Sequence, residues 1–542
     1  MKLENFNNLI ELFFYQSEKQ DPKSILLQWL NPNNKKCFTW EETKLNIFKL
    51  SKIIKENVKE GDRCLLVSEN RPEWFISDLA IMLSGAITVP AYTTYTNDDY
   101  KYLIEDCEPK IVIASNNDIF KKLNTTINEK NFIKKIITFD EVEKAHHNLN
   151  IDNKEKYLNF NSIIKNDLSE KDKIQNLNLK RSSAACIIYT SGTSGNPKGV
   201  ILSHGGILNN LEGACEIMKP LIDSRPVFLT WLPLSHSYEH TVQFAQIAVG
   251  AKVFYAEKIE KLLDNMAEAK PTIMTAVPRF YQNLYNKINI NMKKQTGFKA
   301  KLIQATIRLG KKQLLKEKMT FFEKLLNLIL NVLVRKKVRK QFGGKLKAFV
   351  SGGGALDKEI GEFLNSIGLP TLQGYGLTET SPVVSCNPIH NIKVETVGPP
   401  FKGNKIKISE DGEILVKGEN VMLGYWNQKE ETANVIKDGW LHTGDIGEIN
   451  PEDGYLKITD RKKDIIVSAG GDNISPAKIE NIITNEAEID QCMVYGDKKN
   501  YLVALIVPNE EFLKEKEKIN NVIENINKKL TQVEKIKKIQ LI

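Results

Sequence analysis

Short apolar runs that end in turn-forming residues recur along the chain and alternate with helix-like stretches. RCLLVSEN (63–70), AITVPAY (86–92) and KIVIAS (110–115) have the length and composition of buried strands, and PEWFISDLAIMLSG (72–85) predicts a helix. Further strand candidates are AACIIYT (184–190), FLTWLPL (228–234), KVFYA (252–256), TIMTAVP (272–278), LKAFVSGG (346–353) and LPTLQGYG (369–376). This alternation predicts a mainly parallel sheet covered by helices, with ligands bound at the ends of its strands.

The pattern changes after about residue 395. ISEDGEILVKG (408–418) and NPEDGYLKITD (450–460) alternate apolar and polar positions around Asp-Gly turns, which predicts antiparallel hairpins. Beyond them, IENIITNEAE (479–488) predicts a helix and YLVALIVP (501–508) a strand. We therefore expect an α/β protein. Its large domain, residues 1–459, would hold mainly parallel sheets and a small β-barrel-like subdomain, and residues 460–542 would form a small α+β domain.

Two segments lack this strand-and-helix alternation. Residues 116–180 show little sustained periodicity, so we expect surface helices and loops that carry no chemistry. Residues 291–347 are strongly basic, and apolar residues at helical spacing in 321–334 are followed by RKKVRK (335–340). Two interpretations stay open for this segment: a helical pair packed on the large domain, or a contact with anionic membrane lipid that includes Arg335, Lys336 and Lys337.

Composition narrows the class of protein. A length of 542 residues exceeds the usual size of one hydrophobic core, and 41% apolar with 26% charged residues is ordinary for a soluble protein. The net charge of +9 is a mild bias that does not require nucleic acid. Seven cysteines without a CxxC pair favour reduced thiols over disulfides or a zinc site. Since no uninterrupted apolar stretch of about 20 residues is present, we expect a cytoplasmic protein.

YTSGTSGNPKG (189–199) is the strongest chemical signal. Its glycines and hydroxyl residues leave several N–H and O–H groups free to face anionic oxygens, and Lys198 adds a charge suited to phosphate. The Walker A string is absent, and a proline precedes the lysine. A flexible surface turn would not normally follow a buried strand and combine so many donors with a lysine, so the segment predicts a phosphate-binding loop.

This loop resembles that of the adenylate-forming (AMP-binding) superfamily, and five more strings follow in that family's order. They are LPLSHSYEH (232–240), SGGGAL (351–356), QGYGLTET (373–380), GWLHTGDIG (439–447) and DRKKDIIVSAGGDNISP (460–476). The resemblance runs from about residue 5 to the last residue. Within the superfamily the chain is most similar to the long-chain fatty acyl-CoA synthetases, in which the C-terminal domain is mobile.

The resemblance implies a set of site residues. ATP and AMP contacts would come from Thr190, Ser191, Gly192, Thr193, Ser194, Gly195, Lys198, Gly353, Gly354, Gln373, Gly374, Tyr375, Gly376, Thr378, Asp445 and Arg461. Lys198, Thr378, Glu379 and Arg461 would act in catalysis, with Glu379 as the Mg²⁺ ligand. On the acyl and CoA side, His236 would line the acyl pocket, and Gly470 and Gly471 would leave room for pantetheine. Lys463 would be the hinge of the small domain.

The implied reaction uses ATP, Mg²⁺ and CoA. A carboxylate attacks the α-phosphorus of ATP, pyrophosphate leaves, and the CoA thiol then takes the acyl group from the acyl-adenylate. The basic segment 291–347 resembles an insertion of the long-chain acyl-CoA synthetases. The resemblance therefore implies that the acid is a fatty acid of medium-to-long chain. The expected partners are these substrates, without nucleic acid. Peripheral contact with a membrane through 291–347 stays open beside packing of this segment on the large domain.

The resemblance also implies a last lysine-bearing loop, which bridges the acyl carboxylate and the α-phosphate. The sequence ends at Ile542 before any matching string, so we expect 460–542 to lack this loop and adenylation to be impaired. Three hypotheses stay open. The chain is an acyl-CoA ligase, alone or completed by a separate polypeptide; a non-catalytic protein that binds ATP and acyl groups; or an acyl-AMP ligase that loads a carrier protein.

Overall fold

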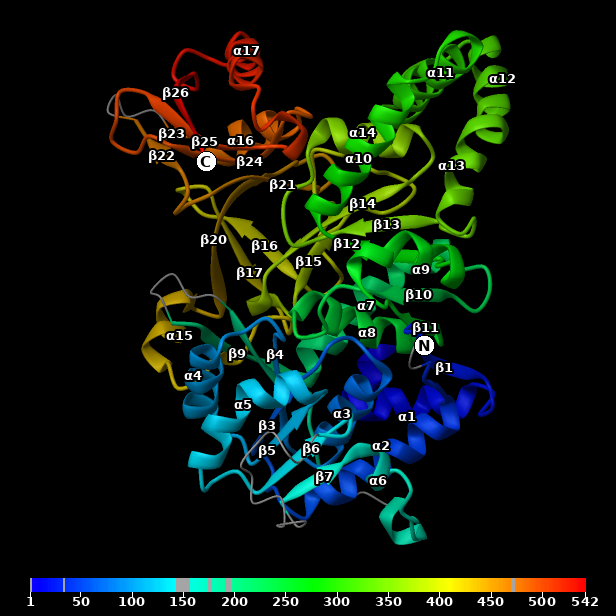
Figure 1. The fold of residues 1–542 in the computed structure, drawn as a ribbon, viewed down its shortest axis with the longest axis vertical. Coiled ribbons are helices and arrows are strands. Elements are labelled where there is room, and N and C mark those ends of the chain that lie inside the picture. Colours follow the sequence, from blue (N-terminus) through cyan, green and yellow to red (C-terminus); the bar gives the residue numbers. More distant parts are fainter. Residues whose placement is uncertain (1, 33–34, 143–155, 174–177, 191–195, 469–472) are drawn as a thin grey trace.

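Two sheets of eight strands form the centre of the molecule, one in the middle of Figure 1 and one in its lower part. The computed structural model describes residues 2–32, 35–142, 156–173, 178–190, 196–468 and 473–542. The first sheet has the order β15 (Val383–Cys386), β14 (Thr371–Gly376), β13 (Ala348–Ser351), β12 (Ile273–Ala276), β10 (Val227–Thr230), β11 (Lys252–Tyr255), β1 (Ile25–Trp29) and β2 (Cys37–Thr39). The second has the order β18 (Gly424–Tyr425), β9 (Lys198–Ser203), β8 (Ala184–Thr190), β4 (Ile87–Ala91), β3 (Arg63–Val67), β5 (Ile111–Ala114), β6 (Lys135–Thr138) and β7 (Tyr157–Asn159).

The strand predictions are confirmed, and the parallel pairs dominate the middle of both sheets. β10 pairs in parallel with β11 and β12, and β12, β13 and β14 continue in parallel. Antiparallel pairs lie toward the edges, among them β8 with β9. The prediction for 116–180 is wrong in part: β6 and β7 are parallel strands of the second sheet. They escape a periodicity search because each has only three or four residues between polar stretches.

Helices cover these sheets and share their cores. They are α1 (Leu9–Lys19), α2 (Trp40–Lys55), α3 (Pro72–Leu83), α4 (Asn97–Cys107), α5 (Asn117–Glu129), α6 (Phe160–Ile163), α7 (His204–Met218), α8 (Ser237–Ala248), α9 (Leu262–Ala269), α10 (Pro278–Lys293), α14 (Lys358–Ser366) and α15 (Lys429–Val435). Every residue of α3 is buried, as expected for a helix that is apolar on most sides. One cluster of buried residues joins α1, α3, α7 and α8 to strands of both sheets, so the two sheets share a core.

The two predicted hairpins are confirmed, and they belong to a third, antiparallel sheet. It consists of β16 (Lys405–Ile408), β17 (Glu413–Lys417), β20 (Trp440–Ile449), β19 (Ile436–Lys437) and β21 (Leu456–Arg461). The chain then forms β22 (Ile466–Val467), β23 (Asn473–Ile474), α16 (Pro476–Thr484), β24 (Ile489–Tyr495), β25 (Leu502–Pro508), α17 (Lys516–Asn527) and β26 (Ile536–Leu541). These last elements have a buried cluster of their own. The division at 459/460 stays a prediction.

Helix α10 contacts this C-terminal part. Arg279 Nη2 lies 3.0 and 3.2 Å from the two carboxylate oxygens of Asp490, and Gln282 Nε2 donates to the carbonyl of Thr484 at 2.5 Å. Figure 1 shows α16 and β24 close to α10, at the top of the molecule. The C-terminal part is thereby placed beside the carboxyl ends of β12, β13 and β14.

Residues 297–341 form a helical arm that projects from the body at the upper right of Figure 1. It consists of α11 (Gly297–Leu314), α12 (Phe321–Leu330), a π-helical turn (Asn331–Arg335) and α13 (Lys336–Gln341). Arg335 is buried and donates to the carbonyls of Ser366, Asn327 and Thr306 at 2.8, 3.3 and 3.1 Å. The idea that Arg335 contacts lipid is therefore wrong, because this side chain fastens the arm to α14. Within the described residues, no helix is long and apolar enough to cross a bilayer.

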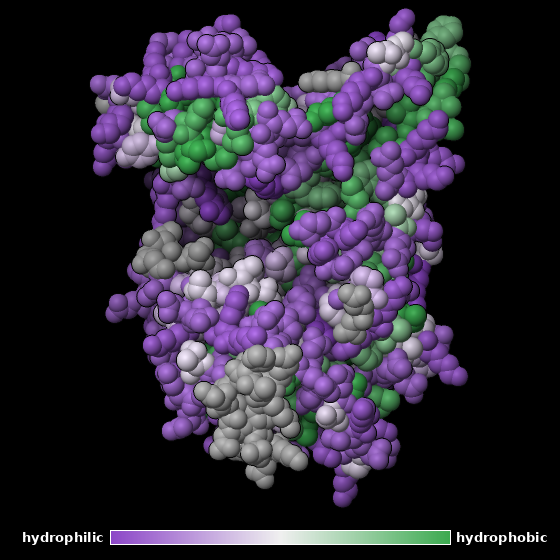
Figure 2. Space-filling model, viewed as in Figure 1, coloured by the Kyte–Doolittle hydropathy of each residue, from purple (hydrophilic) through white to green (hydrophobic). Residues whose placement is uncertain are grey.

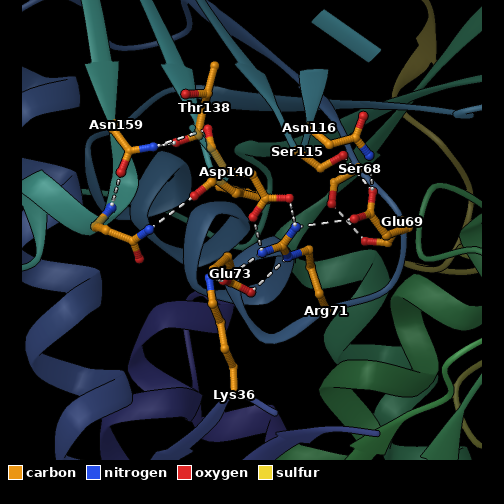
Figure 3. A network of polar contacts seen from close by, with 12 residues as sticks. Lys36, Ser68, Glu69, Arg71, Glu73, Ser115, Asn116, Thr138, Asp140 and Asn159 are labelled. Atoms are coloured by element: carbon orange, nitrogen blue, oxygen red, sulfur yellow. Dashed lines mark hydrogen bonds and ion pairs between the residues drawn. The ribbon is translucent and has the colours of Figure 1, made fainter. Parts of the chain in front are cut away.

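A network of ion pairs occupies the carboxyl ends of β3, β5 and β6 (Figure 3). The fully buried Arg71 donates to Asp140 at 2.9 Å, Glu73 at 3.0 Å and Glu69 at 3.2 Å, and Lys36 reaches Glu73 at 2.5 Å. Burial opposes the charge on Glu73, but Arg71 and Lys36 overcome this effect and lower its pKa. Because these groups satisfy one another, the network joins the loops that follow β3, β5 and β6.

Candidate active site

A single cleft of about 1290 Å³ collects the predicted site residues. It lies at the carboxyl ends of β12, β13 and β14 and is bordered by the antiparallel sheet and by the start of α16. Its walls include Thr190, Lys198, His236, Gly353, Gly354, Gln373, Gly374, Tyr375, Gly376, Thr378, Glu379, Asp445, Arg461 and Lys463. Ser191, Gly192, Thr193, Ser194, Gly195, Gly470 and Gly471 lie outside the described residues. Every predicted site residue within the described part therefore lines this one cleft.

Asp445 anchors one end of the cleft. Its side chain is only 6% exposed, accepts a hydrogen bond from Tyr375 Oη at 2.7 Å and lies 3.2 Å from Arg461 Nε. Asp445 and Arg461 are register partners on β20 and β21, so the antiparallel ladder sets this pair. Burial raises the pKa of Asp445, although Tyr375 and Arg461 both counteract the rise. The result is a buried two-oxygen acceptor next to an aromatic ring and a cation.

Lys198 and Glu379 lie together at another part of the wall, and two residues that the sequence did not single out hold them. Lys198 Nζ donates to Glu431 Oε2 at 2.5 Å and lies 5.2 Å from the centre of the Tyr425 ring. Tyr425 Oη in turn donates to Glu379 Oε1 at 2.9 Å. Tyr425 thus contacts both a cation and a carboxylate, the two kinds of group that a metal-bound polyphosphate requires.

The strand that carries Tyr375 is shaped by a close backbone approach. A Cβ at Gly376 would lie 1.9 Å from the carbonyl oxygen of Pro382, so only glycine allows β14 and β15 to meet there. Beyond it, Thr378 Oγ1 lies 3.1 Å from Ser237 Oγ at the start of α8. Gln373 has a structural task, because its Oε1 accepts from the N–H of Leu356 at 2.6 Å. Local backbone geometry therefore turns Thr378 toward the cleft.

Three titratable residues at the start of α8 differ in their surroundings. His236 caps the helix, with Nδ1 accepting from Tyr238 N at 3.1 Å. Desolvation by the surrounding protein disfavours the charged imidazolium and lowers the pKa of His236. His240 is buried and 2.8 Å from Asp78, which overcomes the effect of burial and raises the pKa of His240 to about 10. Burial raises the pKa of Glu239 to about 8. His236 alone among these three lines the cleft, and His240 is structural.

One wall of the cleft is apolar. It is formed by side chains of α7, α8 and the first sheet: Ala214, Ile217, Met218, Phe228, Val242, Ala245, Ile273, Val350, Val383 and Cys386. The polar end of the cleft, which includes Tyr375 and Asp445, and this apolar wall belong to the same cavity. Sequence alone did not find these residues, because helix and strand positions that face a pocket carry the same apolar pattern as positions that face the core.

The described residues fit a magnesium ion that is also held by phosphate oxygens. They contain no cluster of three or more His, Cys, Asp or Glu side chains able to hold a metal by themselves. Glu379 supplies one carboxylate at the cleft wall, and Mg²⁺ usually takes one or two protein carboxylates plus phosphate and water. Its charge would neutralise that of a polyphosphate. Glu379 is thus the residue of this chain that would hold the ion.

Comparison with protein families gives two matches. A family described as AMP-binding enzyme matches residues 14–426, and a second described as AMP-binding enzyme C-terminal domain matches residues 463–542.

Curated relatives cover most of the chain. The chain is 31% identical over 515 residues to the long-chain-fatty-acid–CoA ligase FadD15 of Mycobacterium bovis, covering 92% of this chain and 81% of that protein. It is 32% identical over 500 residues to long chain acyl-CoA synthetase 3 of Arabidopsis thaliana, with coverages of 87% and 73%. Fatty acyl-CoA synthetase A of Dictyostelium discoideum is 30% identical over 489 residues, with coverages of 85% and 70%.

Solved structures share the fold at lower identity. The anthranilate CoA ligase AuaEII in complex with anthranoyl-AMP has a TM-score of 0.78 at 18% identity, covering all of this chain and 95% of that one. ATP-bound MatB from Rhodopseudomonas palustris has a TM-score of 0.73 at 21% identity, covering 99% and 95%. The expected arrangement, a large α/β domain followed by a small C-terminal domain, is the fold of these proteins.

Proposed function

The chain belongs to the AMP-binding enzyme family, and from this membership we propose that it is a long-chain fatty acid–CoA ligase that forms AMP. The observation that carries the proposal is the cleft, in which all described members of the predicted site meet. The relatives that cover most of the chain carry the names of long-chain acyl-CoA ligases, and this supports the choice of acid and acceptor.

We assign the nucleotide to the polar end of the cleft. Tyr375 would lie against adenine, and the buried carboxylate of Asp445 would accept hydrogen bonds from the ribose hydroxyls, with Arg461 beside it. Lys198 would bind phosphate oxygens as a point charge, which requires Nζ to leave Glu431 when ATP enters. Thr378 would donate to the α-phosphate from its position next to Ser237.

The reaction then follows from the order of groups along the cleft. A fatty-acid carboxylate held on the His236 side attacks the α-phosphorus, the bond to pyrophosphate breaks, and Lys198 and Thr378 stabilise the charge that grows on the phosphate oxygens. In the second step the thiolate of CoA attacks the acyl carbonyl, and AMP leaves. We propose Lys463 as the hinge that lets the C-terminal part present different faces to the two steps.

The apolar wall supports a long acyl chain over a small acid. A chain of methylene groups laid along Met218, Phe228 and Val242 would leave water at about 0.8 kcal/mol per buried CH₂. A short acid would fill little of this wall and gain correspondingly less. Acids of increasing length are therefore expected to show falling KM until the wall is filled.

Pyrophosphate release tests the proposal. The full chain would be incubated with MgATP and laurate, palmitate or oleate, with and without CoA, and both pyrophosphate and acyl-CoA would be measured. We expect release from at least one of these acids and acyl-CoA only when CoA is present. ATP binding without release from any acid would favour a non-catalytic protein, and release without acyl-CoA would favour transfer to a carrier protein.

We also propose peripheral contact with a membrane through residues 291–347. The support is the charge of this segment and the place of the arm, which projects away from the cleft-bearing body (Figure 1). Fatty acids partition into lipid, so an enzyme docked there would meet a higher substrate concentration.

A further inference from the structure

Helix α12 and the π-helical turn that follows it present an apolar face to solvent. Phe321, Phe322, Leu325, Leu328, Ile329 and Val332 are all exposed, by 46–81% of their surface. Their spacing of one, four, seven, eight and eleven residues from Phe321 places them on one side of a helix. In Figure 2 this side is the green band at the upper right, where Figure 1 shows the arm. A contiguous apolar band of this kind is uncommon on a monomeric soluble protein.

The polar face of the same helix is turned inward and fixed there. Glu323 accepts from Lys312 of α11 at 2.9 Å, and Asn327 donates to Gln313 at 2.7 Å. Leu330 is completely buried, and Arg335 in the next turn is fastened to α14. These contacts fix the orientation of α12, so its apolar side is held toward solvent.

The arm is also where the positive charge of the protein resides. Residues 297–341 contain thirteen lysines and arginines against two glutamates, a formal charge of +11, while the whole chain carries +9. Exposed lysines precede α12, lie in it and follow it, among them Lys318, Lys324, Lys336 and Lys337. An apolar face with cationic flanks is complementary to an anionic bilayer, and two such arms would repel one another.

We infer that α12 is the membrane-inserting element of the protein: it lies in the interface of an anionic bilayer, with Phe321, Phe322 and Leu328 among the acyl chains. The flanking lysines contact lipid head groups, while Arg335 holds the arm to the body. This inference deepens the membrane contact proposed above and rests on it; binding of the arm to lipid does not require turnover at the cleft.

Sedimentation with vesicles tests the inference on the full chain. Vesicles of phosphatidylcholine with phosphatidylglycerol are compared with phosphatidylcholine alone, for the wild type and for Phe322→Ser/Leu328→Ser. We expect the wild type to bind the anionic vesicles more tightly, and the double variant to lose about tenfold or more of this affinity. The matched control is Ile259→Ser/Leu513→Ser, which changes two exposed apolar residues outside the arm and should bind like the wild type.

Several results would overturn the inference. These are absence of vesicle binding by the wild type, equal binding by wild type and double variant, and loss of binding in the control pair. A concentration-dependent dimer that the double variant abolishes, without vesicle binding, would instead assign the face to self-association. Pyrophosphate release with a dissolved short-chain acid should be unchanged in the double variant, so failure of the lipid inference is distinguishable from failure of the ligase proposal.

Discussion

Replacing Asp445 by Asn changes one atom of the proposed ribose site and removes its charge. In the structure the two carboxylate oxygens are divided between Tyr375 Oη at 2.7 Å and Arg461 Nε at 3.2 Å. An asparagine can accept through one oxygen only, and its NH₂ group would face either Arg461 or a ribose hydroxyl as a second donor. One of the two charge-assisted bonds that we propose for the ribose is therefore lost or replaced by a weaker neutral one.

The expected loss of ATP affinity follows from the kind of hydrogen bond that is removed. A hydrogen bond to a charged group contributes about 1.5–3 kcal/mol. Since about 1.4 kcal/mol is a factor of ten, ATP binding should weaken about 10- to 150-fold. The folded state should be affected much less, by roughly 1 kcal/mol or below, because Arg461 is 64% exposed and can turn to water.

Calorimetric titration of MgATP into both proteins would measure the affinity, and thermal melting would measure the stability. Glu448→Gln is the matched control: it neutralises an exposed carboxylate on the same strand, paired with Lys457, and should leave ATP affinity unchanged. An Asp445→Asn protein that binds ATP as tightly as the wild type would refute the ribose assignment. So would an equal loss of affinity in Glu448→Gln.

Three further outcomes are expected. Glu379→Gln should raise the Mg²⁺ concentration for half-maximal pyrophosphate release at least about tenfold, measured by metal titration, because the carboxylate ligand is lost. Arg71→Met should lower the free energy of unfolding by about 3–5 kcal/mol in a denaturant titration, because the buried carboxylate of Glu73 loses its main partner. For Glu239, burial raises the pKa to about 8 from 4.5. Between these values the folded protein keeps a proton that the unfolded chain releases, so the contribution of Glu239 to stability should fall from pH 5 to pH 8. The stability of the wild type relative to Glu239→Gln should therefore decrease in melts across that range.

The central strands could be predicted from the sequence because each is a continuous apolar run, a pattern that is visible along the chain without knowledge of the fold. AACIIYT is a continuous apolar run between polar stretches, and the structure has β8 at those same residues, 184–190. Site residues such as Tyr375 and Asp445 were found through their strings, whose order along the chain does not reveal that Tyr375 bonds to Asp445. That contact spans 70 residues and exists only after β14 and β20 have folded.

Features that depend on which way a side chain faces could not be predicted. Tyr425 and Glu431 hold the site residues Glu379 and Lys198, yet nothing in their sequence neighbourhood distinguishes them from surface residues. In the arm, the helical spacing of apolar residues was visible, but whether they face the body or solvent depends on the contacts of α11 and α14. Arg335 shows the same limit, since one arginine in a basic run is buried and the next lysines are exposed.

In the proposed reaction, the carboxylate of a fatty acid attacks the α-phosphorus of ATP in this cleft. Oxygen transfer from palmitate labelled with ¹⁸O in its carboxylate tests it most directly, with the products of a complete reaction with CoA analysed by mass spectrometry. We expect AMP that carries one ¹⁸O atom, because the oxygen that joins the acyl group to phosphorus stays with AMP when the thiol attacks the carbonyl. AMP without label, or label in inorganic phosphate together with ADP, would contradict it.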